Sequence, residues 1–589
     1  MFRKNKKRIS TTWRSEVEPD EIFLDSKNLP KFDTQQFEGR IERPIPKITI
    51  LSLGLFFILI GIIILGRLSF LQIIKGEAYF NLGENNSLSI TPIFSDRGVI
   101  YDRYQTELVW NDLSQRSQLF PGRFYTNLVG FSNLLGYVSY PTKDKAGFYW
   151  QEDIIGKSGL ENYYNEILKG TNGSKILETN VLGETQSESI INPPIHGNNI
   201  FLTIDSQIQE KLFELIANFS EDYSFTGGAG IIMDINNGEL IALVSFPEYD
   251  SEVLSKGSDQ EKINQYLQDD KKPFLFRGVT GAYTPGSIIK PFLALGALNE
   301  EIINPSKKIL STGSISIPNP YFPDQESVFK DWKAHGWVDM KQALAVSSNV
   351  YFYEIGGGFE NQKGLGISNI EKYLQLFGFG EETKIDFPGE ISGTIPTPEW
   401  KKLNFNGDSW RLGDTYHTAI GQYGLQVTPL QMARATAILA NNGVLIYPHL
   451  LLKNNDVALD SVLQNRESST QLLIMSRKSQ GNKEIENLNI KEEYFKTVKE
   501  GMRQAVTTGT ANSLNISGVK VAAKTGTAQL GSAKKYVNSW VIGFFPDDNP
   551  KYSFTVLMEN GPEYYSTTAS HVMRDLLNWM TINTPEYLE

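Results

Sequence analysis

The sequence predicts an α+β protein that carries one N-terminal transmembrane helix. Three observations support this class. An apolar stretch without any charge occupies residues 48–66. Two alternating strand-like segments flank a hairpin signal at Asn237-Gly238, and further strand-like runs return only at 518–527, 539–545 and 552–558, after a long helical section. The first and last strands must then share one antiparallel sheet, with the helices between them in the chain.

The stretch at residues 48–66 has the length of a membrane span. A helix of roughly 20 apolar residues crosses about 30 Å of hydrocarbon, and Lys47 and Arg67 stand where the headgroups begin. The apolar core of a cleaved signal peptide is shorter, about 7 to 15 residues, so we expect an uncleaved anchor. We also expect a mostly disordered cytoplasmic tail at residues 1–47 and an extracytoplasmic chain after residue 67, because basic residues collect on the cytoplasmic side. Those residues are Arg3, Lys4, Lys6, Lys7, Arg8 and Arg14.

Composition excludes several kinds of chemistry. The 589 residues include no cysteine, which rules out disulfides, cysteine-ligated metal sites and a thiol nucleophile. The net charge of −11 disfavours nucleic acid as a partner, because neutralising phosphates requires a clustered basic surface. We predict neither a metal nor a cofactor, since the histidines are spread along the chain without metal-ligand spacing. They are His196, His335, His417, His449 and His571.

A candidate nucleophile lies in the segment YTPGSIIK, where Ser287 and Lys290 are three residues apart at the start of a predicted helix. This spacing places both side chains on one helical face. A serine hydroxyl becomes a good nucleophile when a base removes its proton, and a partly buried lysine with a lowered pKa is such a base. The pattern alone is weak, because it recurs at Ser327, Ser517 and Ser532, each three residues before a lysine.

Two further motifs strengthen this interpretation. Ser347 and Asn349 form a Ser-x-Asn motif in the helical pattern of residues 340–353, where we expect a helix end. Lys524-Thr525-Gly526-Thr527 ends the strand-like run VKVAAKTGT. The three motifs are far apart in the chain, so only the fold can bring them together. Their combination is known from class A β-lactamases and penicillin-binding proteins.

With these motifs the chain resembles the class B penicillin-binding proteins, the monofunctional D,D-transpeptidases of peptidoglycan synthesis. The amino-acid sequence at residues 283–290 and 351–353 is most similar to that of the elongation-type members, with the division-type enzyme as the alternative. The segment between Asn111 and Leu134 is short for the elongation type, which implies a reduced head of the N-terminal module. Further similarities lie at residues 97–103 (RGVIYDR), 159–161 (GLE), 202–205 (LTID) and 410–431.

The resemblance implies a division of the chain into four parts. Residues 1–47 would be the cytoplasmic tail and residues 48–66 the transmembrane helix. Residues 67–226 would form an elongated, β-rich pedestal of the dimerisation type. Residues 227–589 would form a penicillin-binding/serine β-lactamase-like transpeptidase domain, with an antiparallel sheet and a large helical subdomain. The protein would lie in the bacterial inner (cytoplasmic) membrane, with its catalytic domain on the periplasmic or extracytoplasmic side.

The resemblance also implies roles for the motif residues. Ser287 would attack the carbonyl of a D-Ala-D-Ala stem peptide with Lys290 as the base, and terminal D-Ala would leave. Ser347 would relay the proton to the leaving amine, while Asn349 would hold Lys290 and bind the substrate amide. The backbone N–H groups of Ser287 and Thr527 would form the oxyanion hole, and β-lactams would acylate Ser287 as substrate mimics. Substrate would bind along a strand edge through Lys524, Thr525, Gly526 and Thr527.

Partners and alternatives follow from the same resemblance. Expected partners are peptidoglycan stem peptides on lipid-linked or nascent glycan strands, a membrane glycosyltransferase of the shape, elongation, division and sporulation (SEDS) family, and other elongation-complex proteins. Two other functions remain open: a β-lactam hydrolase or D,D-carboxypeptidase that gives the acyl group to water, and an inactive scaffold or β-lactam sensor. The anchor and the large N-terminal module favour the transpeptidase. No residue in the sequence marks a water-activating group, and the short tail leaves little room for a signalling domain.

Overall fold

The computed structural model describes residues 47–77, 88–112, 120–145, 149–179, 185–319, 321–322, 324–452, 487–531, 535–565 and 568–589. The N-terminal basic cluster, nearly the whole predicted cytoplasmic tail and Ser532 lie outside these ranges. The chain divides into two compact units, Met1–Ser89 with Glu178–Glu184, and Ile90–Leu177 with Thr185–Glu589. The apolar helix belongs to the first unit, and all three predicted motifs belong to the second.

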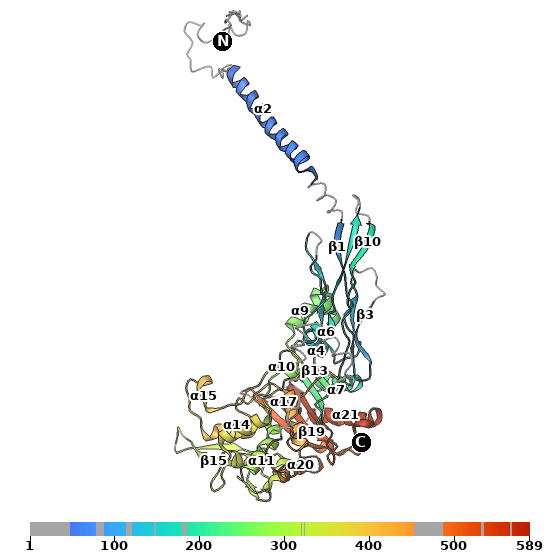
Figure 1. The fold of residues 1–589 in the computed structure, drawn as a ribbon. Helices are drawn as coiled ribbons and strands as arrows, with labels where there is room; N and C mark the ends of the chain where they lie inside the picture. Colours follow the sequence, from blue (N-terminus) through green and yellow to red (C-terminus); the bar gives the residue numbers. More distant parts are fainter. Residues whose placement is uncertain are drawn as a thin grey trace, which may run out of the picture. The chain divides into compact units, whose positions relative to one another are not determined.

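The first unit contains a long apolar helix. α2 (Lys47–Ser69) continues into a π-helical turn at Phe70–Ile74, so the helical segment is longer than the predicted residues 48–66 (Figure 1). The segment Ile50–Ile74 is long and apolar enough to cross a membrane, and its apolar window is not buried within the protein. An exposed apolar surface of this length fits the hydrocarbon core of a bilayer.

The N-terminal module is built from short strands. β1 (Leu88–Ile93), β9 (Gly173–Thr179) and β10 (Thr185–Asn192) form one sheet, in that order. A second sheet has the order β11 (Ile200–Phe201), β2 (Ile100–Tyr101), β3 (Glu107–Asp112) and β4 (Gly122–Tyr125). Smaller ladders pair β5 (Val138–Ser139) with β8 (Ile155–Gly156), and β6 (Thr142–Lys143) with β7 (Tyr149–Gln151).

Apolar residues recur at helical spacing over residues 159–170, which predicts one amphipathic helix, but the structure has two short helices there. α5 (Gly159–Tyr163), which contacts α4 (Ser132–Leu135), is separated from α6 (Asn165–Leu168) at Tyr164, whose backbone has φ −96° and ψ 20°. The Tyr164 hydroxyl donates to Oδ2 of Asp386 at 2.5 Å, and Asp386 is far from Tyr164 in the sequence. The single-helix prediction was wrong because local periodicity does not report such a long-range contact.

A buried ion triad joins two of the segments on which the family resemblance rests. Arg97 Nε donates to Glu161 Oε2 at 2.5 Å, and Arg123 Nε donates to Glu161 Oε1 at 2.7 Å. All three side chains have an exposed fraction of 1% or less. Arg97 also donates to the Ile154 carbonyl at 2.9 Å. Because both arginines depend on one carboxylate, Glu161 connects β4 and α5 to the segment before β2.

We expect Glu161→Gln to destabilise the module by about 3–5 kcal/mol, because it leaves two buried guanidinium groups without a counter-charge. Thermal or urea unfolding of the full-length protein in detergent measures this loss. The matched control is Glu188→Gln, since the Lys175–Glu188 pair is solvent-exposed. An exposed pair contributes about 0–1 kcal/mol, so equal effects of the two substitutions would contradict the role of the triad.

The central sheet of the C-terminal region combines early and late strands, as predicted. Its order is β13 (Leu240–Phe246), β12 (Gly227–Asp234), β20 (Tyr552–Pro562), β19 (Tyr536–Phe545) and β18 (Ala522–Leu530). β12 pairs antiparallel with both β13 and β20. The hairpin turn between β12 and β13 requires a positive φ of 87° at Gly238. The five-stranded sheet leaves β18 at one edge.

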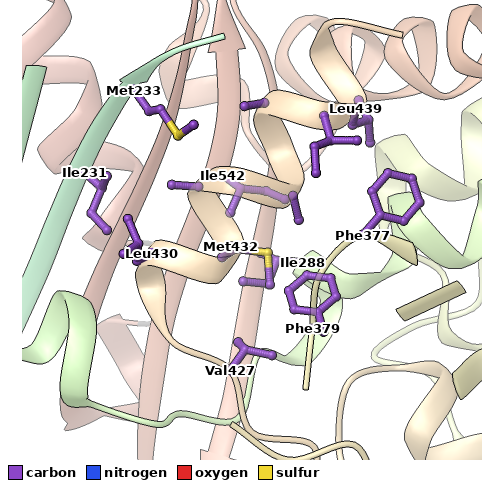
Figure 2. Close-up of a cluster of buried hydrophobic side chains, with 14 of the residues drawn as sticks. Ile231, Met233, Ile288, Phe377, Phe379, Val427, Leu430, Met432, Leu439 and Ile542 are labelled. Atoms are coloured by element: carbon purple, nitrogen blue, oxygen red, sulfur yellow. The ribbon is translucent and has the colours of Figure 1, made fainter. Parts of the chain in front are cut away.

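Helices cover both faces of this sheet. α7 (Ser206–Asp222), capped by Asp205, and α21 (Thr568–Asn583) share one apolar cluster with Ile232 and Val541. Figure 2 shows the other face, where Ile231 and Met233 of β12 lie near Leu430 and Met432 of α17 (Pro429–Ala440). Successive strand residues thus point into two separate cores, the alternation expected of a sheet covered on both sides.

The helical subdomain lies in the chain between β13 and β18. It includes α8 (Ser251–Lys256), α9 (Gln260–Gln268), α10 (Arg277–Thr280), α11 (Lys290–Asn299), α12 (Met340–Val346), α13 (Asn349–Gly357), α14 (Gly366–Leu376), α15 (Pro398–Asn404), α16 (Leu412–Ala419) and α20 (Glu492–Thr507). Two short ladders pair β14 (Ile309–Ser311) with β17 (Gly336–Val338), and β15 (Ser314–Pro318) with β16 (Glu326–Lys330). The predicted α+β class is confirmed.

Candidate active site

The candidate nucleophile stands on a short turn in front of a buried helix. Gly286–Ile289 is a 3-10 helix, here η2, and it leads directly into α11, which begins at Lys290. Gly286 has φ +59°, and its N–H donates to the Gly421 carbonyl at 2.9 Å. This bond ties the turn to the segment at 410–431, which the resemblance singled out. Ser287 is half-buried, while Lys290 is fully buried.

The Ser-x-Asn motif lies at a junction between two helices. The sequence predicted a helical pattern over residues 340–353 with a helix end at the motif. The structure has two helices here, because α12 ends at Val346 and α13 begins at Asn349. Ser347 adopts the left-handed conformation (φ 58°), which a non-glycine residue takes only at a local cost, and it therefore ends α12. The Ser348 hydroxyl then caps α13 by accepting from the Tyr351 N–H at 3.3 Å.

The third motif lies on the edge strand of the central sheet. Lys524, Thr525, Gly526 and Thr527 are part of β18, and the Thr527 side chain is exposed along that edge. A Cβ at Gly526 would lie 2.8 Å from Ile288 Cγ2 and 2.9 Å from the Pro285 carbonyl oxygen. Only glycine therefore lets β18 approach the nucleophile turn so closely.

Lys290 and Lys524 converge on Ser347. Lys290 Nζ donates to Asn349 Oδ1 at 2.7 Å and to the Ser347 carbonyl at 2.8 Å, and it lies 3.4 Å from Ser347 Oγ. Lys524 Nζ donates to the same Ser347 Oγ at 2.8 Å. The fold thus joins three motifs that are far apart in the sequence into one polar cluster.

Burial changes the protonation of both lysines. It lowers the pKa of Lys290 to about 7, although the nearby carboxylate of Asp331 acts in the opposite direction. Burial also lowers the pKa of Lys524, and the positive charge of Lys290 adds to this effect. An amine whose pKa lies near 7 can take a proton from a serine hydroxyl and return it within one reaction cycle.

Every candidate residue from the sequence lies in this region, but several of its neighbours were not predicted. Asp331 accepts hydrogen bonds from the segment after Ser347, and the hydroxyl oxygens of Thr510 and Thr525 are 2.7 Å apart. A lone aspartate or threonine has no motif, so no signal in one sequence could have found them. Two of the other Ser-x-x-Lys repeats belong to different surroundings. Ser327 lies on β16, and Lys520, which follows Ser517, forms an ion pair with Asp548.

Within the described parts of the chain, no three histidine, aspartate or glutamate side chains are grouped so as to hold a metal ion. The polar groups that face one another at the cluster are amines, hydroxyls and a carboxamide. Such a set can activate a serine hydroxyl, pass a proton between neighbours and bind a carboxylate.

Comparison with known proteins finds two protein families that match parts of this chain. The family model described as the penicillin binding protein transpeptidase domain matches residues 228–578, and that of the penicillin-binding protein dimerisation domain matches residues 116–202. A relative from Haemophilus influenzae named peptidoglycan D,D-transpeptidase MrdA is 32% identical over 492 residues, covering 77% of this chain and 69% of that protein. The protein of the same name from Escherichia coli is 26% identical over 597 residues, covering 85% and 89%.

Among solved structures, Pseudomonas aeruginosa PBP2 in complex with WCK 5153 is 27% identical to this chain, with a TM-score of 0.63. The similarity covers 83% of this chain and 97% of that one. These matches confirm the predicted resemblance to penicillin-binding proteins and the predicted class of enzyme, a D,D-transpeptidase. Because the transpeptidase match extends over more than half of the sequence, the chain belongs to the penicillin-binding protein transpeptidase family.

Proposed function

We propose that this protein is a membrane-anchored peptidoglycan D,D-transpeptidase of the elongation type, which works through an acyl-enzyme on Ser287. The observation that carries the proposal is the buried amine of Lys290. Lys290 is the first residue of the helix that follows Ser287, and its amine contacts Ser347 and Asn349. Its pKa of about 7 leaves much of it as a free base at neutral pH.

Acylation uses the first two motifs. Lys290 takes the proton of the Ser287 hydroxyl as its oxygen attacks the carbonyl of the penultimate D-Ala. The bond to the terminal D-Ala then breaks, and the leaving amine receives a proton through Ser347. Ser347 suits this relay because its Oγ lies 3.4 Å from Lys290 Nζ and 2.8 Å from Lys524 Nζ. The resulting ester has lost D-Ala and awaits an amine acceptor from a second stem peptide.

Substrate binding uses the edge of β18. An extended peptide can add to an exposed strand edge through main-chain hydrogen bonds. Thr527 is exposed there and Lys524 is buried, so a terminal carboxylate would meet hydroxyl groups and the Lys524 amine, whose protonated form the carboxylate would stabilise. The N–H groups of Ser287 and Thr527 would stabilise the oxyanion. Each donor of this kind contributes roughly 2.7–4 kcal/mol in a known serine hydrolase.

The membrane arrangement and the domain limits belong to the same proposal. We propose a cytoplasmic tail (1–47), an anchor that includes residues 48–66, a pedestal (67–226) and a transpeptidase domain (227–589) in the periplasm or extracytoplasmic space.

The proposed partner is a SEDS-family glycosyltransferase that makes the glycan strands to be cross-linked. Co-purification from membranes should recover it with the intact anchor, and its absence would count against the partnership.

The lifetime of the penicillin adduct tests the proposed reaction. The full-length protein in detergent is incubated with a fluorescent penicillin, and the labelled band is followed for hours after excess drug is removed. A transpeptidase keeps the label, because its acyl ester is protected from water. Incubation with nascent glycan strands should also release D-Ala and yield cross-linked stem peptides. Loss of the label within seconds, with turnover of penicillin, would support a hydrolase instead.

A further inference from the structure

A buried carboxylate lies behind the Ser-x-Asn motif. Asp331 follows β16 directly, and its side chain has an exposed fraction of 0%. Its Oδ2 accepts from Ser348 Oγ at 2.8 Å, from the Val350 N–H at 3.0 Å and from Ser311 Oγ at 3.2 Å. Its Oδ1 accepts from the Trp332 N–H at 2.9 Å. One carboxylate therefore connects β14, the β16–β17 segment and the start of α13.

These bonds determine where Ser347 and Asn349 lie. Asn349 is the first residue of α13, and Ser347 is the left-handed residue that ends α12, so neither is held by a continuous helix. Asp331 holds this junction from the α13 side. Trp332 holds it from the α12 side, because its Nε1–H donates to the Val346 carbonyl at 3.2 Å. The whole segment at 346–350 is thus positioned by two adjacent residues that belong to none of the three motifs.

Asp331 also places a negative charge near the candidate base. Burial opposes its ionisation, but N–H groups of Asn349 and Val350 and the Ser348 hydroxyl hold the pKa of Asp331 below its usual range. Asp331 in turn raises the pKa of Lys290 against the effect of burial. The other charged or titratable groups around the two residues are Lys333, His335, Tyr353 and Lys524. Burial lowers the pKa of His335, so it is mostly neutral at pH 7 and Asp331 is the negative charge of this group.

We propose that Asp331 is a positioning residue for acyl transfer, which holds Ser347 and Asn349 against Lys290 and supplies the negative charge beside that amine. This inference rests on the proposed acyl-enzyme function of Ser287. It adds a residue that does not touch substrate and acts through the two motifs that do.

The test is the pH profile of acylation for Asp331→Asn. The rate at which a fluorescent penicillin labels the full-length protein is measured from pH 5.5 to 9. The neutral side chain keeps the size of aspartate but removes its charge, so the pKa of Lys290 falls and the midpoint of the profile moves to lower pH by on the order of one unit. The maximal rate falls about 10- to 100-fold, because Ser347 and Asn349 are no longer held in place. A purely structural role would lower the rate without moving the midpoint.

Further variants make the result decisive. Asp331→Glu keeps the charge, so its midpoint stays close to that of the wild type while its rate falls. Asp386→Asn is the matched control: Asp386 is a half-buried carboxylate that also accepts from two backbone N–H groups, those of Leu450 and Leu451. Its loss should lower thermal stability and leave the midpoint unchanged. Should Asp331→Asn not fold, Ser348→Ala removes one donor and should lower the rate about 10-fold at an unchanged midpoint.

The outcomes separate this inference from the proposed function. If the wild type is never labelled, both the proposed acyl-enzyme function and the role of Asp331 are wrong. A labelled wild type together with an Asp331→Asn profile of the same rate or the same midpoint would overturn the role of Asp331 alone. A Ser348→Ala variant as fast as the wild type would likewise overturn it.

Discussion

Ser287→Ala is expected to abolish covalent labelling by a fluorescent penicillin, a loss of at least about 10⁴-fold in acylation rate. Alanine has no hydroxyl to form the ester. The substitution removes one atom from a half-buried residue whose turn is held by backbone contacts, such as the Gly286 N–H bond to Gly421. The fold should therefore persist, and the melting temperature of the full-length variant should stay close to that of the wild type. Gel fluorescence and thermal unfolding on the same sample separate lost chemistry from lost structure.

Ser327→Ala is the matched control for this experiment. Ser327 and Lys330 have the same Ser-x-x-Lys spacing, but they lie on β16 rather than on η2 and α11. The control should be labelled as fast as the wild type. In cells that carry only Ser287→Ala, peptidoglycan cross-linking by this enzyme should be lost. A labelled Ser287→Ala protein would place the nucleophile on another residue.

Lys290→Met is expected to slow acylation by about 10²- to 10⁴-fold, the usual contribution of a general base. In the wild type, the rate should rise with pH and be half-maximal near pH 7. The sign follows from burial: it lowers the pKa of Lys290 to about 7, so the amine is protonated and inactive below that pH and free above it. The variant should lose this rise together with the rate. Acylation rates measured from pH 5.5 to 9 check both effects.

Lys290→Arg distinguishes a base from a positive charge. Arginine keeps the charge near Asn349 and Ser347, but its guanidinium does not lose a proton at these pH values. If Lys290 acts as the base, the arginine variant should be about as slow as the methionine variant. An arginine variant with most of the wild-type rate would show that charge alone suffices and would contradict the proposed proton transfer.

Structural features that depend only on a short stretch of sequence could be predicted. The apolar helix depends only on residue type along one segment, because a membrane span satisfies its own backbone hydrogen bonds. The β12–β13 hairpin follows from the positive φ that glycine allows at Gly238. The three motifs were recognisable because each is a fixed spacing of reactive residue types. These features predicted the α+β class and the family, which are confirmed, and they named the candidate site residues, whose roles stay a prediction.

Local pattern failed where distant contacts decide the backbone. Periodicity predicted one helix through Tyr164 and one helical pattern on both sides of Ser347, and in the structure each is divided into two helices. Tyr164 bonds to Asp386, and the Ser347 junction is clamped by Asp331. Neither partner is near in sequence, so no window of neighbouring residues contains the information.

The sequence by itself determined which residues can carry the chemistry, because a nucleophile, a base and a proton relay are properties of side-chain type and spacing. Only the tertiary structure decided what those side chains do at neutral pH. Lys290 and Lys524 are ordinary lysines until the fold buries both of them beside Ser347, with Asp331 as the nearby negative charge. Burial removes the water that stabilises the charged amine, and water is excluded only when segments far apart in the chain pack together.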